Sequence, residues 1–280
     1  MTTLTAPSRP SLTAGAEDVR PVRRRLGPGA PIRFGGLVGI AVLLVSWVVG
    51  SATGLLDERN LSAPWTVVET AGTLIENGRL QESLVTSGIR AAVGLGIGVL
   101  VGVVLAVISG LSRIGESLID GPVQVKRSIP TLALIPLLIL WLGIGEPMKV
   151  LTIALAVFVP IYIHTHNGLR TIEGRYAELA ETLGVGRGEF IRHVVLPGAM
   201  PGFLLGLRFA VTSSLLALVV VEVINATSGI GHMITLASSY GQTDIIVVGL
   251  VVYALLGVTA DGVVRLIERK ALSWRRTLAS

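Results

Sequence analysis

Residues 178–197 read E-L-A-E-T-L-G-V-G-R-G-E-F-I-R-H-V-V-L-P, and this polar stretch lies between two long apolar runs. The segment 173–183, which overlaps its start, is rich in helix formers and places apolar side chains on one helix face. These side chains are Tyr176, Leu179, Ala180 and Leu183. The pattern predicts an amphipathic helix that projects from a membrane protein.

Three glycines, Gly184, Gly186 and Gly188, follow this predicted helix at alternate positions. Glycine adopts the backbone angles of a helix end or a turn without strain, so the helix should break here. A second short amphipathic helix is expected over 189–196, and it should stop at Pro197. A partner protein could bind the resulting helix, turn and helix from the water side.

The composition is that of a membrane protein. Of the 280 residues, 51% are hydrophobic and 15% are charged, whereas about 25% are charged in a typical soluble domain. The formal charge of +5 does not indicate nucleic acid, because the basic residues lie at the ends of apolar runs. The chain has no cysteine, which excludes a disulfide, a thiol nucleophile and a thiolate metal site.

Six apolar runs are candidates for membrane-spanning helices, so the expected fold is an all-α polytopic bundle. The runs are 34–56, 91–112, 128–145, 150–168, 198–221 and 244–264. Residues 1–33 are expected to form a disordered tail, 57–90 an extracytoplasmic connection and 269–280 a second tail. The first run could instead be a cleaved signal peptide, but it is longer than a signal core of about 7–15 residues.

Lysine and arginine are distributed unevenly between the two sides of these runs. Nineteen of the 23 lie in 1–33, 113–127, 170–208 and 265–280, all on the same side. Basic residues favour the cytoplasmic side of a membrane. The distribution therefore predicts that both termini and the stretch 178–197 lie in the cytoplasm.

Gly94, Gly98 and Gly102 recur every fourth residue within the second run. They should line one helix face and allow another helix to approach closely. A nucleotide-binding interpretation of Gly94-x-Gly96-x-Gly98 fails, because no strand precedes it.

The stretch 178–197 resembles the cytoplasmic loop of the permease subunits of bacterial ABC importers. That loop has E-A-A, three residues, G, nine residues, I, one residue and L-P. The matching positions here are Glu178, Leu179, Ala180, Gly184, Val194, Leu196 and Pro197. Leu179 replaces an alanine and Val194 an isoleucine, and both stay apolar. The alternative is an ordinary loop between two membrane helices, since a motif by itself is a hypothesis.

The resemblance implies the MetI-like fold of type I importers, with a permease core over 91–268 and a coupling loop over 173–197. In that family the loop docks into a groove on a separate ATPase subunit. The implied partners are two ATPase copies, an extracytoplasmic substrate-binding protein, a second copy of this chain and membrane lipid. No G-x-x-x-x-G-K-[ST] occurs in the chain. We therefore expect no enzymatic activity and no bound cofactor in this chain, with ATP used by the partner.

Further segments resemble the permeases for aliphatic sulfonates, a subgroup close to those for taurine and nitrate. They are I-S-G-L-S-R-x-G-E (108–116), P-x-L-A-L-I-P-L-x-I-L-W (130–141), H-V-x-L-P-G-A-x-P (193–201), N-x-x-S-G-I-G (225–231) and Q-T-D (242–244). The resemblance implies import of a small organic anion, most closely an aliphatic sulfonate, with taurine, nitrate or another small solute as alternatives.

Five residues are candidates for a transport pathway. They are Glu222, Pro130, Pro136, Ser213 and Ser214. A carboxylate in a membrane should face the bundle interior or water, although Glu222 could also mark a helix end at the interface. Prolines interrupt helices beside pathways or form simple kinks, and the hydroxyls could donate to an anion.

The residues give less support to two other interpretations, an ion-coupled secondary transporter and a metal site. An ion-coupled secondary transporter would need intramembrane ionisable residues, for which Glu222 is the clear candidate, and would show an inverted repeat, which is not evident. A metal site is not expected, because His164 and His166 are two residues apart and point in different directions on a helix.

Overall fold

The computed structural model of the protein describes residues 35–273, and every regular element in that range is a helix. The chain divides into two compact units, Met1–Val45 and Ser46–Ser280. Helix α1 (Gly35–Ala52) begins in the first unit and ends in the second. The predicted tail 1–33 and the end of the second tail lie outside the described residues. The all-α prediction is confirmed.

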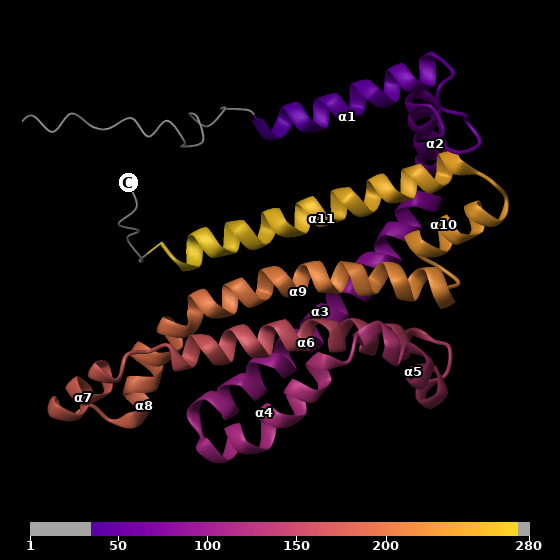
Figure 1. Ribbon diagram of the computed structural model, residues 1–280. Coiled ribbons are helices and arrows are strands. Elements are labelled where there is room, and N and C mark those ends of the chain that lie inside the picture. The colour runs from indigo at the N-terminus through magenta and orange to yellow at the C-terminus, as the bar shows by residue number, and fades with distance from the viewer. Residues whose placement is uncertain (1–34, 274–280) are drawn as a thin grey trace, which may run out of the picture. The chain divides into compact units, whose positions relative to one another are not determined.

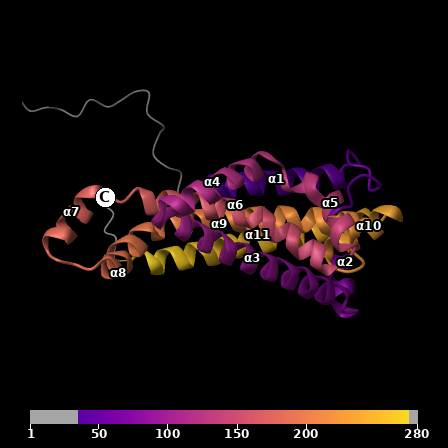
Figure 2. The ribbon, with the colours of Figure 1, turned by 90° about the horizontal axis from the view of Figure 1, so that it is seen from below.

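Four helices of the second unit are long and apolar enough to cross a membrane. They are α3 (Arg79–Leu111), α6 (Glu146–Arg170), the continuous helix Arg187–Ile224 and α11 (Thr243–Ala271). The shorter helices lie at their two ends in both ribbon views. α2 (Pro64–Glu76), α5 (Ile135–Leu142) and α10 (Ile230–Ser239) are at one end, and α7 (Gly174–Thr182) and α8 (Arg187–Phe190) are at the other (Figures 1 and 2).

The predicted glycine face is confirmed, and it packs against α6. A Cβ added at Gly98 would lie 2.6 Å from Val157 Cβ and 2.7 Å from the Ala154 carbonyl oxygen. Gly94 and Gly102 approach Ile153 and Ile161 in the same way, one turn on either side. Small residues at every fourth position thus bring the two backbones together, which is how helices associate in lipid.

The opposite side of α6 packs closely against α9 (Leu196–Asn225). A Cβ added at Gly202 would lie 2.6 Å from the His164 carbonyl oxygen, and one added at Gly168 would lie 2.9 Å from that of Ala199. Both faces of α6 are therefore in near-backbone contact, and the helix forms the centre of the bundle.

The predicted third span, 128–145, is wrong as a single helix. α4 (Arg113–Ser128) is followed by the 3-10 turn η1 (Thr131–Leu134) and the eight-residue α5, and the two halves are bent by 91°. Pro130 lies at the bend and disfavours the helical conformation of Ile129, which is extended. The predicted count of six is therefore not reproduced: residues 35–273 contain four single spans, or five if the bent pair crosses as one, and α1 is a shorter apolar helix.

Helix α3 begins at Arg79, twelve residues before the predicted start of the second span at 91. Gly78 has φ +77°, a left-handed conformation that separates α2 from α3. The segment 57–90 therefore contains α2 and the first three turns of α3. Likewise α11 extends to Ala271, into the segment assigned to the second tail.

Candidate functional site

Helix α7 and the turn after it have the geometry that the sequence predicted. Gly184 has φ +69°, its amide donates to Glu181 O at 3.1 Å, and the amide of Val185 donates to Ala180 O at 2.9 Å. These two bonds form a Schellman motif, the glycine-dependent helix end that satisfies the last free carbonyl groups. Only glycine adopts this conformation without strain, so the break at Gly184 follows from local physics.

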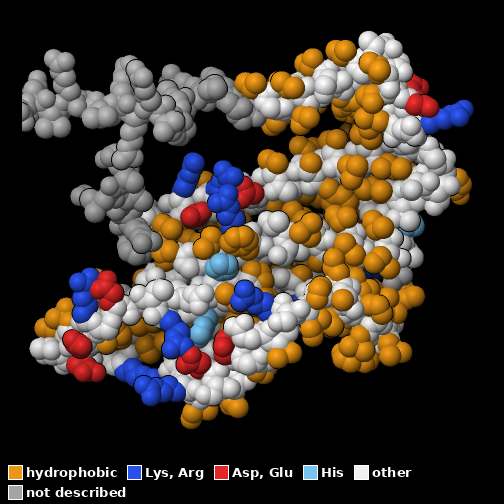
Figure 3. Space-filling model, viewed as in Figure 1, with side chains coloured by type: hydrophobic (Ala, Val, Ile, Leu, Met, Phe, Trp, Pro, Cys, Tyr) orange, Lys and Arg blue, Asp and Glu red, His pale blue; other side chains and the backbone are white. Residues whose placement is uncertain are grey.

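The predicted apolar face of α7 is uncovered. The side chains of Tyr176, Leu179 and Leu183 are 45%, 55% and 69% exposed. Glu178 is also exposed and Ala180 is half-buried. Charged side chains gather around α7 and α8 in Figure 3, so the apolar groups lie within a polar surface. Apolar side chains presented in this way suit a groove on a partner protein.

The prediction that the second short helix stops at Pro197 is wrong. α8 continues through a π-helical turn, η2 (Ile191–Val195), into α9, so the helix Arg187–Ile224 has 38 residues. A proline near a turn of altered hydrogen bonding removes one amide donor without ending the helix. A helix of this length measures about 57 Å, almost twice the thickness of a bilayer core. α8 therefore extends well beyond the apolar part of the helix.

Only some of the predicted apolar positions in this helix face the bundle. Val195 is buried against Leu169 and Ala199, whereas Val194 and Pro197 are half-buried and Leu196 is exposed. The Arg187 side chain donates to the carbonyl oxygen of Leu111 at 3.1 Å. This contact ties the start of α8 to the end of α3.

Glu222 is fully buried and accepts hydrogen bonds from several elements. Ser87 Oγ on α3 contacts its two carboxylate oxygens at 2.7 and 2.8 Å, and Tyr253 on α11 donates at 2.8 Å. The amide of Gly231, in the first turn of α10, donates at 2.9 Å. Glu222 therefore faces the bundle interior, one of the two environments expected of it, and its acceptor sites are occupied by protein donors. A role in a transport pathway stays a prediction.

Arg90 links Glu222 to the start of α6. Its Nη1 forms an ion pair with Glu222 and also donates to Ser228 O at 3.1 Å. Its Nε and Nη2 donate to the two carboxylate oxygens of Glu146 at 2.6 and 2.7 Å, and Lys149 Nζ reaches the same carboxylate at 2.9 Å. We call Arg90, Glu146, Lys149 and Glu222 the charge cluster. It joins α3, α6 and α9 at the end of the bundle opposite to α7.

The sequence analysis missed three members of this cluster. Arg90, Glu146 and Lys149 lie at or near the ends of apolar runs, where charges usually mark a membrane boundary. One signal could have revealed Arg90: it is the one charged residue between positions 83 and 112. A lone arginine inside so long an apolar helix needs a carboxylate partner.

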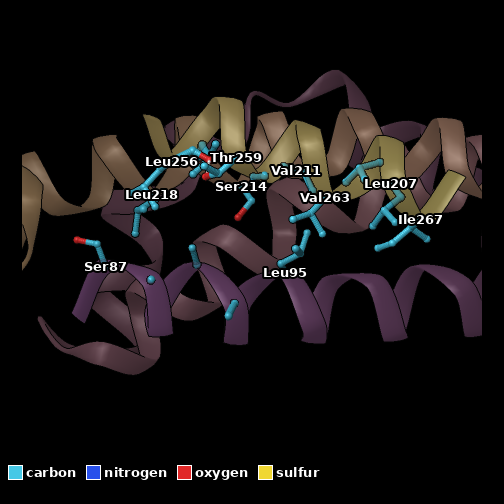
Figure 4. Close-up of a pocket in the computed structure, with 16 residues that line it drawn as sticks. Ser87, Leu95, Leu207, Val211, Ser214, Leu218, Leu256, Thr259, Val263 and Ile267 are labelled. Atoms are coloured by element: carbon cyan, nitrogen blue, oxygen red, sulfur yellow. Dashed lines mark hydrogen bonds between the residues drawn. The ribbon is translucent and has the colours of Figure 1, made fainter. Parts of the chain in front are cut away.

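The remaining pathway candidates do not converge on one site. Ser214 is buried and lines a cavity of about 380 Å³ between α3, α9 and α11, together with Ser87 (Figure 4). Ser213 is half-buried and is not among the lining residues. Pro130 and Pro136 are exposed, at and just after the bend between α4 and α5. The cavity walls are mainly apolar.

The two histidines of α6 contact different aromatic rings. His164 stacks on Phe209 of α9 with ring centroids 5.2 Å apart, and His166 stacks on Tyr162 at 5.5 Å. Between residues 35 and 273 there is no group of three or more His, Asp or Glu side chains suited to holding a metal ion.

A bundle of long apolar helices, with a polar helix and glycine turn projecting from one end, defines a membrane subunit of a transport system. Residues 98–273 match the family described as binding-protein-dependent transport system inner membrane component, and the chain belongs to that family. It is a multi-pass inner-membrane permease subunit of the ABC importer class. The family prediction is confirmed.

Two relatives and one solved structure place the chain within this family. It is 37% identical to the aliphatic sulfonates transport permease protein SsuC of Bacillus subtilis over 272 residues, which is 97% of both chains. It is 44% identical to the Escherichia coli protein of the same name over 237 residues, 85% of this chain and 89% of that one. A crystal structure of an amino acid ABC transporter has a TM-score of 0.55 at 16% identity, covering 86% of this chain and 100% of that chain. The last comparison supports the fold alone.

Proposed function

We propose that this chain is the membrane-spanning subunit of an ATP-driven importer for small organic anions, with aliphatic sulfonates as the substrate class. The observation that carries the proposal is the 37% identity to a sulfonate permease over 97% of both chains. Because this identity extends over nearly the whole chain, it covers the membrane-spanning helices as well as the segment proposed to contact the ATPase. Taurine and nitrate are close alternatives in chemistry, since each has an anionic oxygen-bearing head group.

The exposed apolar face of α7 is the proposed contact with the ATPase. Tyr176, Leu179 and Leu183 would fill a groove on that subunit, and Gly184 would set the angle at which α8 leaves it. Glu178, Ala180, Val194, Leu196 and Pro197 complete the segment. Because each chain has one such segment, a homodimer of this chain would engage two ATPase subunits. ATP hydrolysis is then assigned to those partners.

The orientation of the chain is part of the same proposal. Nineteen of 23 basic residues would face the cytoplasm together with both termini and α7. The charge cluster would then lie at the extracytoplasmic end, where a binding protein delivers the solute, and the long helices would contact lipid. ATP binding could shift the permease between its two orientations only if the ATPase contacts α7 differently in each.

Transport by reconstituted vesicles tests the proposal directly. The purified chain is inserted into liposomes with its ATPase, and the binding protein is added outside with ethanesulfonate, taurine or nitrate. We expect uptake of ethanesulfonate that requires both ATP and the binding protein. Preference for taurine or nitrate would correct the substrate class. Uptake driven by an ion gradient without ATP would instead support a secondary transporter and refute the proposal.

A further inference from the structure

Two buried cations in the charge cluster converge on a carboxylate that is open to solvent. The side chains of Arg90 and Lys149 are 1% and 3% exposed, whereas that of Glu146 is 57% exposed. Glu146 accepts from Arg90 through both of its carboxylate oxygens and from Lys149 through one of them. A single solvent-exposed carboxylate therefore pairs with two cations that have almost no contact with water themselves.

The second carboxylate keeps Arg90 in place from the other side. Glu222 contacts Arg90 through Nη1, while Glu146 uses Nε and Nη2. If the side chain of Glu146 turned into the water, Glu222 and the carbonyl of Ser228 would still orient the guanidinium. The edge formed by Nε and Nη2 would then present a planar pair of donors, which is the geometry that binds oxyanions with two parallel hydrogen bonds.

Charge balance favours exchange of one anion for another at this edge. Arg90 and Lys149 carry two positive charges, and Glu146 and Glu222 carry two negative ones, so the cluster is neutral. An empty site would leave a buried cation unpaired, which is strongly unfavourable. A ligand with one negative charge could replace the Glu146 carboxylate and keep the cluster neutral.

We infer that the Glu146 side chain occupies an oxyanion-binding site, and that the head group of the anionic substrate displaces it. This inference rests on the proposed function and assigns it a substrate-contact site. A sulfonate carries one charge over three oxygens. Two of them match the Arg90 edge and the Lys149 ammonium, and the hydroxyl of Ser228, 3.2 Å from Arg90 Nη2, is a donor for the third. The ligand class is therefore a monovalent oxyanion.

Direct binding of ethanesulfonate tests this assignment. The permease is purified in lipid nanodiscs with its ATPase, and binding of radiolabelled ethanesulfonate is measured without ATP or binding protein. Glu146→Gln removes the competing charge but keeps the shape, so we expect the half-saturation concentration to fall by about tenfold, the ratio expected from one charged hydrogen bond. Lys149→Met removes a donor and should raise it by at least about tenfold.

Two further variants serve as controls. Glu76→Gln removes an exposed carboxylate at the end of α2 that forms no ion pair within the described part of the chain, and it should bind like the wild type. Glu146→Asp keeps the competing charge and should bind no more tightly than the wild type. A purely structural ion pair predicts the opposite for Glu146→Gln, namely weaker binding. A lower melting temperature without ligand is expected in either case, because the variant leaves a buried cation unpaired.

The inference and the proposed function fail in different ways. If the wild type imports ethanesulfonate with ATP but Glu146→Gln and Lys149→Met bind it as the wild type does, the assigned site is overturned and the importer stands. If the wild type imports no small anion with ATP, the proposed function is refuted. Tighter binding by Glu146→Gln together with weaker binding by Lys149→Met supports the site.

Discussion

Substituting Gly98 by alanine should force α3 away from α6. The new Cβ would lie 2.6 Å from both Cβ and Cγ1 of Val157 and 2.7 Å from the carbonyl oxygen of Ala154, whereas ordinary contact begins at 3.4 Å. Val157 is β-branched and has one favoured rotamer in a helix, and the carbonyl belongs to the backbone, so neither can turn aside. The two helices must therefore separate. Overpacking of this kind destabilises a protein by about 1–3 kcal/mol.

Gly96 provides the matched control, because it lies on the same helix two residues earlier. A Cβ added there meets nothing within 4 Å, and alanine is favoured over glycine in a helix by up to about 1 kcal/mol. Thermal unfolding in one detergent can be followed by the fluorescence of the chain's four tryptophans. We expect Gly98→Ala to unfold several degrees lower, at about 2–4 °C for each kcal/mol, and Gly96→Ala to unfold at or above the wild type. An unchanged melting temperature for Gly98→Ala would refute the close packing.

Three further predictions concern the candidate sites. Gly184→Ala imposes a left-handed conformation that costs about 1–2 kcal/mol in a non-glycine residue, so ATP-dependent uptake should fall while membrane insertion is unchanged; Gly186→Ala, at φ −66°, should transport normally. Leu183→Glu places a charge on the exposed apolar face of α7, so less ATPase should co-purify at an unchanged melting temperature, and full ATPase recovery would contradict the docking surface. Ser87→Ala removes a buried hydroxyl that donates to Glu222 and should destabilise the protein by about 1–3 kcal/mol. Thr86→Ala, whose hydroxyl contacts only a carbonyl of its own helix, should change the melting temperature little.

The features that the sequence predicted well arise from local periodicity. Gly94, Gly98 and Gly102 share a helix face because four residues make about one turn. This prediction did not require the partner helix, α6, to be identified. The break at Gly184 likewise depends on a backbone angle that few other residues adopt. Neither prediction required knowledge of a distant contact.

The features that could not be predicted depend on contacts between distant parts of the chain. Ser87 and Glu222 are 135 residues apart in the sequence, and Arg90 and Glu146 are 56 apart. A sequence pattern of one or two helical turns contains neither pair. The continuation of the helix through Pro197 was missed for a different reason. A proline permits either a helix end or a helix with one absent hydrogen bond, and the surrounding packing decides between them.

Helix α6 connects the two regions that the proposals concern. It begins at Glu146 in the charge cluster and ends at Arg170, which forms an ion pair with Glu116 of α4, and α7 follows four residues later. Its 25 residues span about 37 Å. Glycines of α3 and α9 hold it in near-backbone contact on both sides, and closely packed helices shift as rigid bodies more readily than they bend. A displacement of α7 by a partner would therefore reach the charge cluster as a movement of the whole helix. The same movement would change the distance between Glu146 and Arg90, because these two residues lie on different helices.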